Sequence, residues 1–434
     1  MSSRRSFLKS SLATAGLVGL ASAAHPAQAE STLPPAIAAI PSYTGRIAPF
    51  TNAERLARIA RARQLMALHQ MDAIVLSNST ASSRYFANLR LDGWERMWAL
   101  VIPAKAAPFL ICPHFEEGRA HEELADGPFA KDASIYTWEE DQSPFALLAS
   151  ALRERGISTG TIGLDEQMKW AFAHGIAQAA PQLKCVSATP ITAGCRMIKE
   201  QHELDCIRLA GEATLAVYRA VCLSLTPGMK TDDVERLIHQ AYQRTGLRGY
   251  ASINIDEFTA LPHGSRQPQT LREGSILLLD DGCEIEGYTS DLTRTYVLGK
   301  PTDKMRRVFD VVHQAQSAAR TTARPGVPAA EVDRAARKVV EDAGFGPGFK
   351  YFTHRLGHGI GMDMHEWPYF VANNMAGDDP KPALAAGMVL TAEPGIYIPG
   401  EFGIRLEDEL HITPNGAEFL TPISSSIDEP FGRS

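Results

Sequence analysis

Apolar runs of strand length alternate with amphipathic stretches of helix length between about residues 51 and 190. Thr51, a helix-capping residue type, stands at the start of one amphipathic stretch, which runs to about Gln70. Ser143 takes the same position before a second stretch, which ends near Arg155. This alternation of strands and helices predicts an α/β domain. The expected strands cover residues 72–76, 98–103, 109–112 and 161–164.

A second unit begins near Arg196 with a long helical pattern, and its sequence repeats itself at an offset of 98 positions. Each copy has a Pro-Gly pair, then an acidic, an apolar, an acidic and a basic residue, and finally a glycine. Such a repeat predicts an internal duplication, in which each half is a pair of helices followed by strands. The second unit is therefore expected to be an α+β domain of two similar halves. The two copies are Pro227-Gly228, 233–236 and Gly246, and Pro325-Gly326, 331–334 and Gly344.

The first 29 residues have the order of a processing segment. Arg4-Arg5 forms a twin-arginine pattern, an uncharged stretch follows over 10–24, and the small residues at 27–29 suit cleavage. We expect export by the twin-arginine pathway and a mature protein in the periplasm. No apolar run reaches the roughly 18 residues that a membrane-spanning helix needs, so stable membrane insertion is not expected.

After the processing segment we expect a linker, residues 30–44, and two domains, residues 45–195 and 196–434. Pro34-Pro35 and Pro41 make the linker extended. A chain that is 44% hydrophobic and 21% charged is not a disordered one. Removal of the segment, which holds three basic and no acidic residues, changes the net charge from −7 to −10, and this argues against nucleic acid as a partner. Six cysteines without a CxxC pair make disulfides optional.

Two apolar strands in the second unit each end in an acidic residue, Asp280 and Glu393. If the chain returns through a turn at Ile285-Glu286, Asp280 faces Asp291 across a hairpin. The same reasoning for the second strand places Glu393 opposite Glu407. Opposed residues have their Cβ atoms roughly 5 Å apart. Each acidic pair therefore either meets a cation or lies in water, because burying it without neutralisation costs too much.

Three histidines, His354, His358 and His365, lie within twelve residues between these acids. Glycines at alternate positions among them indicate a strand or a loop rather than a helix. Four carboxylates and one imidazole form an oxygen-rich site for divalent Mn, Co, Fe or Zn and carry too much negative charge for one ion. Two ions roughly 3.5–4 Å apart fit this charge, with a bridging hydroxide as the nucleophile for a polarised carbonyl.

The residues around these acids and histidines resemble the pita-bread metallopeptidases, which include aminopeptidase P, prolidase, methionine aminopeptidase and creatinase. The resemblance extends over about residues 45–425, because the front α/β unit is similar to the amino-terminal domain that aminopeptidase P, prolidase and creatinase share. It implies a creatinase-like domain at 45–195 and a pita-bread catalytic domain at 196–434. The matching motifs cover residues 280–295, 354–366, 391–395 and 403–408.

By motif position, the resemblance implies that five side chains bind two divalent metal ions, with manganese as the expected metal and Co, Zn or Fe as alternatives. Asp291 and Glu407 would bridge the two ions. Asp280 would hold one ion, and His358 and Glu393 the other. Glu393 would also accept a proton from the attacking water.

Four further catalytic positions carry over from the resemblance. His263 would line the site, His354 and His365 would contact the substrate, and Arg405 would support the carboxylates from behind. On the residues alone, His263 is equally well a surface-loop residue, because Pro262 and Gly264 flank it.

The resemblance implies an exopeptidase that hydrolyses the Xaa-Pro bond at the amino end of short peptides, as an aminopeptidase or as a dipeptidase. The alternative is a non-peptidase enzyme on the same scaffold, such as a metal-dependent dimethylsulfoniopropionate lyase. Asp281 beside Asp280 and the bulky residues 367–370 depart from the common family pattern and keep this alternative open. A non-catalytic binding module would lack the five ligands. Relatives often form oligomers, so a homodimer or a larger homo-oligomer is expected.

Overall fold

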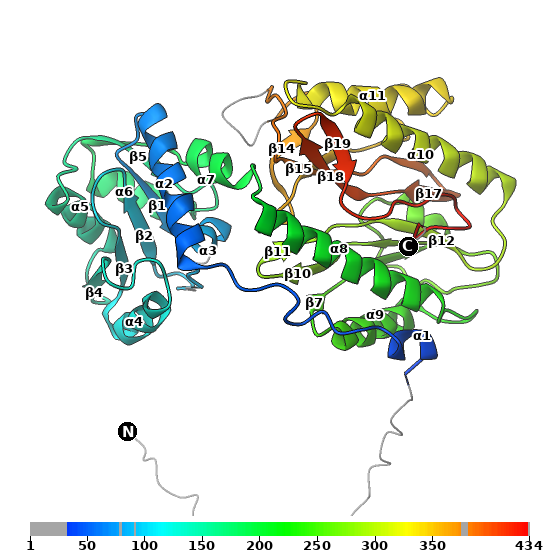
Figure 1. Ribbon diagram of the computed structural model, residues 1–434, viewed down its shortest axis with the longest axis horizontal. Helices are drawn as coiled ribbons and strands as arrows, with labels where there is room; N and C mark the ends of the chain where they lie inside the picture. The colour runs from blue at the N-terminus through cyan, green and yellow to red at the C-terminus, as the bar shows by residue number, and fades with distance from the viewer. Residues whose placement is uncertain (1–32, 78–79, 91–92, 375–380, 433–434) are drawn as a thin grey trace, which may run out of the picture.

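The computed structural model describes residues 33–77, 80–90, 93–374 and 381–432. The chain forms a front domain, which ends near Arg196, and a second domain beside it (Figure 1). The expected processing segment, residues 1–29, lies outside the described residues. In the part of the chain that is described, no helix is both long and apolar enough to cross a membrane.

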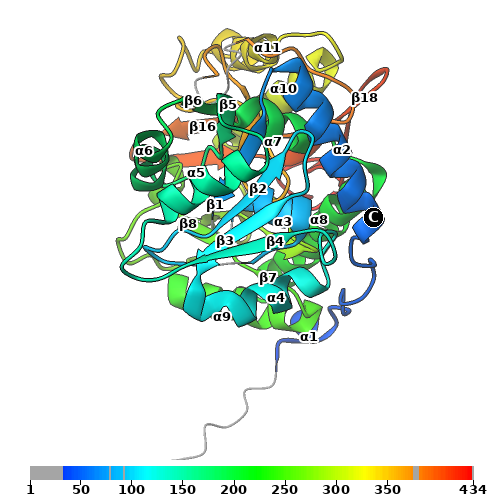
Figure 2. The ribbon, with the colours of Figure 1, turned by 90° about the vertical axis from the view of Figure 1, so that its left-hand side faces the viewer.

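The front domain is a six-stranded mixed sheet with helices on both faces (Figure 2). Its strands are β1 (Ala73–Ser77), β2 (Ala99–Pro103), β3 (Phe109–Pro113), β4 (Ser134–Trp138), β5 (Gly160–Leu164) and β6 (Leu183–Ser187). Its helices are α2 (Asn52–Leu68), α3 (Ala81–Ala87), the 3-10 turn η1 (His114–Glu116), α4 (Glu117–Ala125), α5 (Pro144–Glu154), α6 (Trp170–Ala179) and α7 (Thr189–Arg196). The strand order is β4-β3-β2-β1-β5-β6.

Alternation along the strands divides the front domain into two cores. Ile74 and Leu76 of β1 pack toward α2, α3 and α7, whereas Ala73 and Val75 pack toward α5 and α6. The α/β architecture and the four expected strands are confirmed, each within about one residue of its predicted end. The edge strands β4 and β6 carry exposed and half-buried residues, and for this reason no continuous apolar run announced them.

The second domain is built of two successive halves, each a helix pair followed by strands. The first half contains α8 (Gln201–Cys222), α9 (Thr231–Thr245), β7 (Arg248–Gly249), β8 (Ser252–Ile255), η2 (Asp256–Ala260), β9 (Ile276–Asp280), β10 (Cys283–Ile285), β11 (Tyr288–Thr289) and β12 (Arg294–Val297). The second half contains α10 (Asp303–Thr322), α11 (Ala329–Asp342), β13 (Gly357–Gly359), β14 (Glu366–Phe370), β15 (Val389–Ala392), β16 (Gly395–Ile398), β17 (Phe402–Arg405), β18 (Asp408–Thr413) and β19 (Gly416–Phe419).

The two halves repeat one another in their backbone contacts, which confirms the predicted duplication. The amide of Gly228 donates to the carbonyl of Leu271 at 2.8 Å, and the amide of Gly326, 98 positions later, donates to the carbonyl of Leu384 at the same distance. Both glycines adopt a positive φ, 95° and 85°. The repeated Pro-Gly pair therefore forms the same turn ahead of α9 and α11, since glycine enters this conformation without steric cost.

The two acidic hairpins differ in how well their register was predicted. The first register is wrong by two positions: the turn lies at Glu286-Gly287, and Asp280 consequently faces Thr293 instead of Asp291. Both turn residues have positive φ, 50° and 89°, which is typical of the tight turns that match strand twist. The second register is confirmed, because β15–β18 and β16–β17 pair as expected on either side of Glu393 and Glu407.

The expected extended linker covers residues 30–44, and its described part, residues 33–44, is in part helical. Helix α1 (Pro35–Ala38) has its proline in the first turn, where the ring suits a helix. Ile37, Ile40 and Tyr43 are buried in one core with residues of α8 and α9. The segment is thus part of the second domain, since its apolar residues gain more from burial than an extended chain in water would.

A buried polar cluster joins the two domains. Arg58 of α2 donates to the Tyr288 hydroxyl at 3.1 Å, and this hydroxyl donates to Glu203 of α8 at 2.6 Å. Arg58 and Glu203 are 2% and 0% exposed and lie 3.7 Å apart. The guanidinium also lies over the rings of Phe50 and Tyr85. In a charge pair buried this deeply, removal of either partner leaves the other charge buried and unneutralised.

We expect Arg58→Ala to lower the free energy of unfolding by about 3–5 kcal/mol, because Glu203 would remain buried without its cation. The matched control is Arg84→Ala, which removes an exposed inter-domain bridge to Glu284 and should cost less than about 1 kcal/mol. Urea denaturation of both variants measures the difference. Equal losses in the two variants would show that the buried cluster does not hold the domains together.

Candidate metal centre and substrate cavity

One cavity of about 550 Å³ collects the side chains that the sequence singled out. It lies in the second domain, and both duplicated halves contribute to its walls. All nine expected site residues line it: His263, Asp280, Asp291, His354, His358, His365, Glu393, Arg405 and Glu407. Six other residues complete the lining: Tyr250, Ser252, Pro262, Asp281, Arg355 and Met364.

The five expected metal ligands reach the cavity from strand ends and from one strand interior. Asp280 ends β9, Asp291 precedes β12, and His358 is the central residue of β13. Glu393 directly follows β15, and Glu407 lies between β17 and β18. Side chains inside a strand point alternately to the two faces of the sheet, so several acids there would not converge. At strand ends the backbone can turn, and the carboxylates can point to one place.

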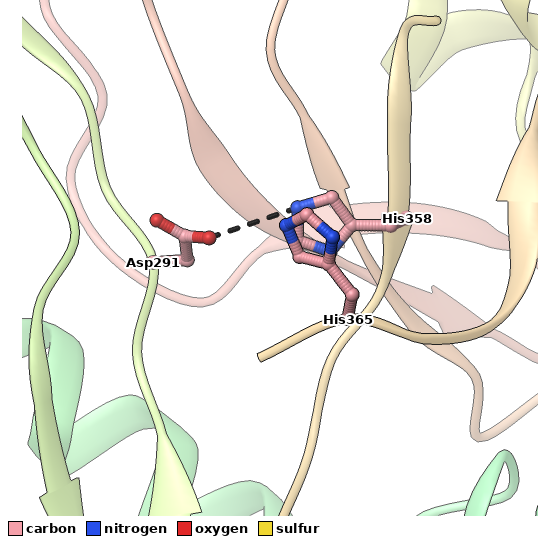
Figure 3. A group of neighbouring side chains, drawn as sticks. All are labelled: Asp291, His358 and His365. Carbon is pink, nitrogen blue, oxygen red and sulfur yellow. Dashed lines mark ion pairs between the residues drawn. The ribbon is translucent and has the colours of Figure 1, made fainter. Parts of the chain in front are cut away.

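Their donor atoms form two groups that share Glu407. Asp280, Asp291 and Glu407 bring one oxygen each within 4.8 Å of one another, and a ring nitrogen of His358 lies equally close to one oxygen each of Glu393 and Glu407. A third group joins Asp291 and His358 to His365 (Figure 3). Two adjacent groups with one common carboxylate are what a pair of neighbouring cations requires.

His358 is oriented as a metal ligand. Its Nδ1 lies 3.1 Å from the Gly359 carbonyl and therefore carries the proton, which leaves a lone pair on Nε2. That lone pair faces carboxylate oxygens of Glu393 at 3.4 Å and Asp291 at 3.6 Å. Burial, and then the neighbouring His365, hold the pKa of His358 well below its usual value, so a second proton does not bridge this gap. A metal cation fits there.

The carboxylates themselves indicate a missing positive charge. Burial, and then the charge of Asp280, raises the pKa of Asp291 well above the usual range, and burial, followed by the charge of Asp291, does the same for the pKa of Glu407. Burial also raises the pKa of Glu393 to about 7. Glu407 Oε1 is buried without a hydrogen-bond partner among the described residues. Divalent ions satisfy both needs, since they bind oxygen and neutralise charge.

Arg405 holds the carboxylate side of the site in place. It pairs with Asp280 at 2.5 Å and donates from Nε to the Thr293 hydroxyl at 3.0 Å. That hydroxyl lies 2.5 Å from Asp280 and 2.7 Å from Glu407. Although burial acts in the opposite direction, Arg405 lowers the pKa of Asp280. Thr293 was not identified from the sequence, although it stands in the matched motif.

The ring nitrogens of His354 are both engaged inside the protein. Arg405 can only donate to the Tyr397 hydroxyl, at 2.9 Å, so this hydroxyl donates in turn to His354 Nε2 at 2.7 Å. The proton then sits on Nδ1, 2.7 Å from the Arg355 carbonyl. Burial, followed by the charge of Arg405, lowers the pKa of His354 to about 3. His354 is thus neutral and lines the cavity with both ring nitrogens already hydrogen-bonded. No sequence signal marked Tyr397.

His365 and His263 lie on the exposed side of the cavity. The rings of His365 and His358 are 3.8 Å apart (Figure 3). Arg355 lies 3.3 Å from His365 Nδ1 and can only donate, so the proton of a neutral His365 is on Nε2. His263 is both an exposed loop residue and part of the lining, so its two expected descriptions are compatible.

The loop that carries His365 is tied to the domain junction. Glu366 accepts from the amides of Met362 and Asp363 and pairs with Lys199 at 3.0 Å. Arg196, at the end of α7, pairs with Asp363 at 3.0 Å. These contacts are largely buried, so the front domain helps to position the substrate side of the cavity.

Two family profiles match the chain. Metallopeptidase family M24 matches residues 205–414, and the creatinase/prolidase N-terminal domain matches residues 58–198. The second match covers the front domain and the first covers every expected metal ligand.

Similar proteins match about four fifths of the chain. The probable dipeptidase PepE of Mycobacterium tuberculosis is 35% identical over 336 residues, which are 77% of this chain and 85% of that protein. The Xaa-Pro dipeptidase of Lactobacillus delbrueckii subsp. lactis is 32% identical over 375 residues, 82% of this chain and 94% of that protein. The crystal structure of dipeptidase PepE from Mycobacterium ulcerans superposes with a TM-score of 0.77 at 33% identity, covering 86% of this chain and 97% of that one.

We expect Glu407→Gln to remove most of the stabilisation that Mn²⁺ gives the protein, because both donor groups lose their shared carboxylate. At a thousandfold excess over its dissociation constant, a ligand adds about 4 kcal/mol to the free energy of unfolding. Thermal unfolding with and without Mn²⁺, together with metal analysis, measures this response. The matched control is His365→Ala, which should lose activity but keep the metal response and the bound metal. A His365→Ala protein that is folded but no longer binds metal would contradict the placing of His365 outside the metal ligands.

Proposed function

Because the chain belongs to metallopeptidase family M24 and carries a creatinase/prolidase N-terminal domain, we propose that it is an exported Xaa-Pro dipeptidase with two divalent metal ions. Membership of this family makes it a peptidase and a metalloenzyme. The names of its relatives as dipeptidases support the choice of substrate.

The two donor groups support a pair of ions. Asp280, Asp291 and Glu407 would hold one ion, and His358, Glu393 and Glu407 the other, with Glu407 common to both. Mainly carboxylate donors favour manganese over softer metals. When bound, such ions would activate water and polarise the carbonyl of the scissile bond.

The chain's own residues supply the proton transfers and orient the substrate. Glu393 lines the cavity and is itself a member of one donor group, so it is placed to take a proton from the attacking water and deliver it to the leaving nitrogen. The Nε2–H of His365 can donate to the oxygen of the scissile carbonyl as negative charge develops there. Arg405, Thr293 and Tyr397 keep Asp280 and His354 in fixed positions throughout.

Arg355 is the residue that supports a preference for dipeptides over longer peptides. Its guanidinium lines the cavity, lies 4.1 Å from the ring centre of Tyr369 and makes no ion pair with any described carboxylate. Such a cation, held in place by stacking, fits the free carboxylate of a dipeptide. A tripeptide has a neutral amide where a dipeptide has its free carboxylate. Arg355 would therefore not improve the binding of the longer substrates of an aminopeptidase.

Export is proposed from the twin-arginine pattern at Arg4-Arg5 and is compatible with the cysteines. All six lie in the described ranges, and none of them forms a disulfide. A protein without disulfides can fold in the reducing cytoplasm before export. Cell fractionation tests this: the double variant Arg4→Lys, Arg5→Lys should stay in the cytoplasm, whereas the natural chain should reach the periplasm. Equal distribution of both would contradict the proposal.

The first experiment offers Ala-Pro and Ala-Pro-Ala to residues 30–434 loaded with Mn²⁺ or Co²⁺, with a chelator as control. We expect the dipeptide to be the better substrate, and Arg355→Gln to raise KM for Ala-Pro and lower kcat/KM roughly 10- to 100-fold with little effect on the tripeptide. Faster release of alanine from the tripeptide would identify an aminopeptidase instead. No cleavage of either peptide by the metal-loaded protein would overturn the proposed function.

A further inference from the structure

The cavity contains one carboxylate that belongs to neither metal-donor group. Asp281 lines the cavity next to Asp280 but takes no part in the donor sets formed by the described residues. Its neighbour Asp280 faces Arg405 and Thr293, whereas the carboxylate of Asp281 turns to Ser252 of β8, on the opposite side of β9 from β12. Its role is thus separate from that of the five expected ligands.

The backbone around Asp281 holds its side chain in a fixed direction. The residue has φ 98°, a left-handed conformation that is strained for residues other than glycine. Its carbonyl accepts from the amide of Leu292 at 3.1 Å and from the hydroxyl of Tyr218 at 3.0 Å. Its Oδ2 accepts from the amide of Ser252 at 3.1 Å. Strain of this kind persists where the surroundings impose it, and it clusters at binding sites.

No cation of the described chain neutralises Asp281. It forms no ion pair within 4 Å, and Arg405 is already engaged by Asp280, Thr293 and Tyr397. A carboxylate that faces a cavity and has no ion-pair partner is suited to a positively charged ligand group.

Aromatic and polar side chains flank this carboxylate at the cavity wall. Tyr250, 60% exposed, donates its amide to the Gly282 carbonyl at 2.9 Å and so lies beside Asp281. The ring can cover the aliphatic part of a long side chain, while Asp281 and Ser252 offer oxygen to its charged end. A lysine or arginine side chain has this composition.

We propose that Asp281, with Tyr250 and Ser252, forms a subsite for a basic side chain, so that the enzyme favours lysine or arginine before the scissile bond. The inference rests on the proposed dipeptidase function for the identity of the substrate. Arg355 would then bind the carboxylate of the dipeptide, and Asp281 would bind the basic side chain of its first residue.

The test compares Lys-Pro with norleucyl-proline, whose side chain is apolar and carries no charge. We expect the wild-type enzyme to prefer Lys-Pro roughly tenfold or more in kcat/KM, and Asp281→Asn to reduce this ratio to about one without loss of bound metal. Asparagine is chosen because it tolerates positive φ, so the fold should be kept. The matched control is Glu286→Gln, which removes an acid at φ 50° in the adjacent turn, outside the cavity, and should leave the ratio unchanged.

Calorimetric binding of free lysine and free norleucine tests the basic subsite separately from the proposed dipeptidase function. If the enzyme cleaves no Xaa-Pro dipeptide but binds lysine more tightly in an Asp281-dependent way, the dipeptidase function fails and the subsite stands. If Asp281→Asn slows both dipeptides by the same factor, or if wild-type enzyme does not distinguish lysine from norleucine, the basic subsite is overturned.

Discussion

Repulsion among four carboxylates in one cavity is the constraint on which the rest of this structure depends. Asp280, Asp291, Glu393 and Glu407 converge with the lone pair of a neutral imidazole, and Glu407 keeps a buried oxygen without a partner among the described residues. Burying such a group is unfavourable unless cations neutralise it. The site is therefore built for bound metal, and the surrounding fold must hold the acids together until metal arrives.

The duplicated second domain provides that support. Strand ends from each half line the same cavity. Polar contacts join the two halves, because Arg405 from the second half donates hydrogen bonds to Asp280 and Thr293 from the first. Gly357 shows how tightly the strands pack, since an added Cβ would lie 2.0 Å from the Thr391 carbonyl oxygen. The alternate glycines around His358 thus serve close strand approach, and this places the imidazole between acids from both halves.

The front domain contributes to the site through the junction. Arg196 and Lys199 hold Asp363 and Glu366, which bracket His365, and the buried Arg58–Glu203 pair anchors α2 to α8. The substrate side of the cavity therefore depends on both domains, whereas the metal side depends only on the second. Arg355 and Asp281, to which we assign the choice of substrate, line the cavity but take no part in the metal-donor groups.

Local residue patterns by themselves predicted the α/β front domain, the duplication, the four acids and the histidine cluster, because apolar periodicity and motif spacing are properties of neighbouring residues. The resemblance to a known family added His263, Arg405 and the expected role of each residue. Tertiary structure alone decided the rest. The first hairpin register depended on which residues could adopt positive φ, the edge strands β4 and β6 depended on pairing with distant strands, and α1 joined a core made by α8 and α9. Thr293 and Tyr397 acquired contacts from Glu407 and His354, 114 and 43 positions away, and Arg355 reaches His365, ten positions away, only through the folding of the loop between them. No local pattern marked these three residues, because hydrogen bonds act through space.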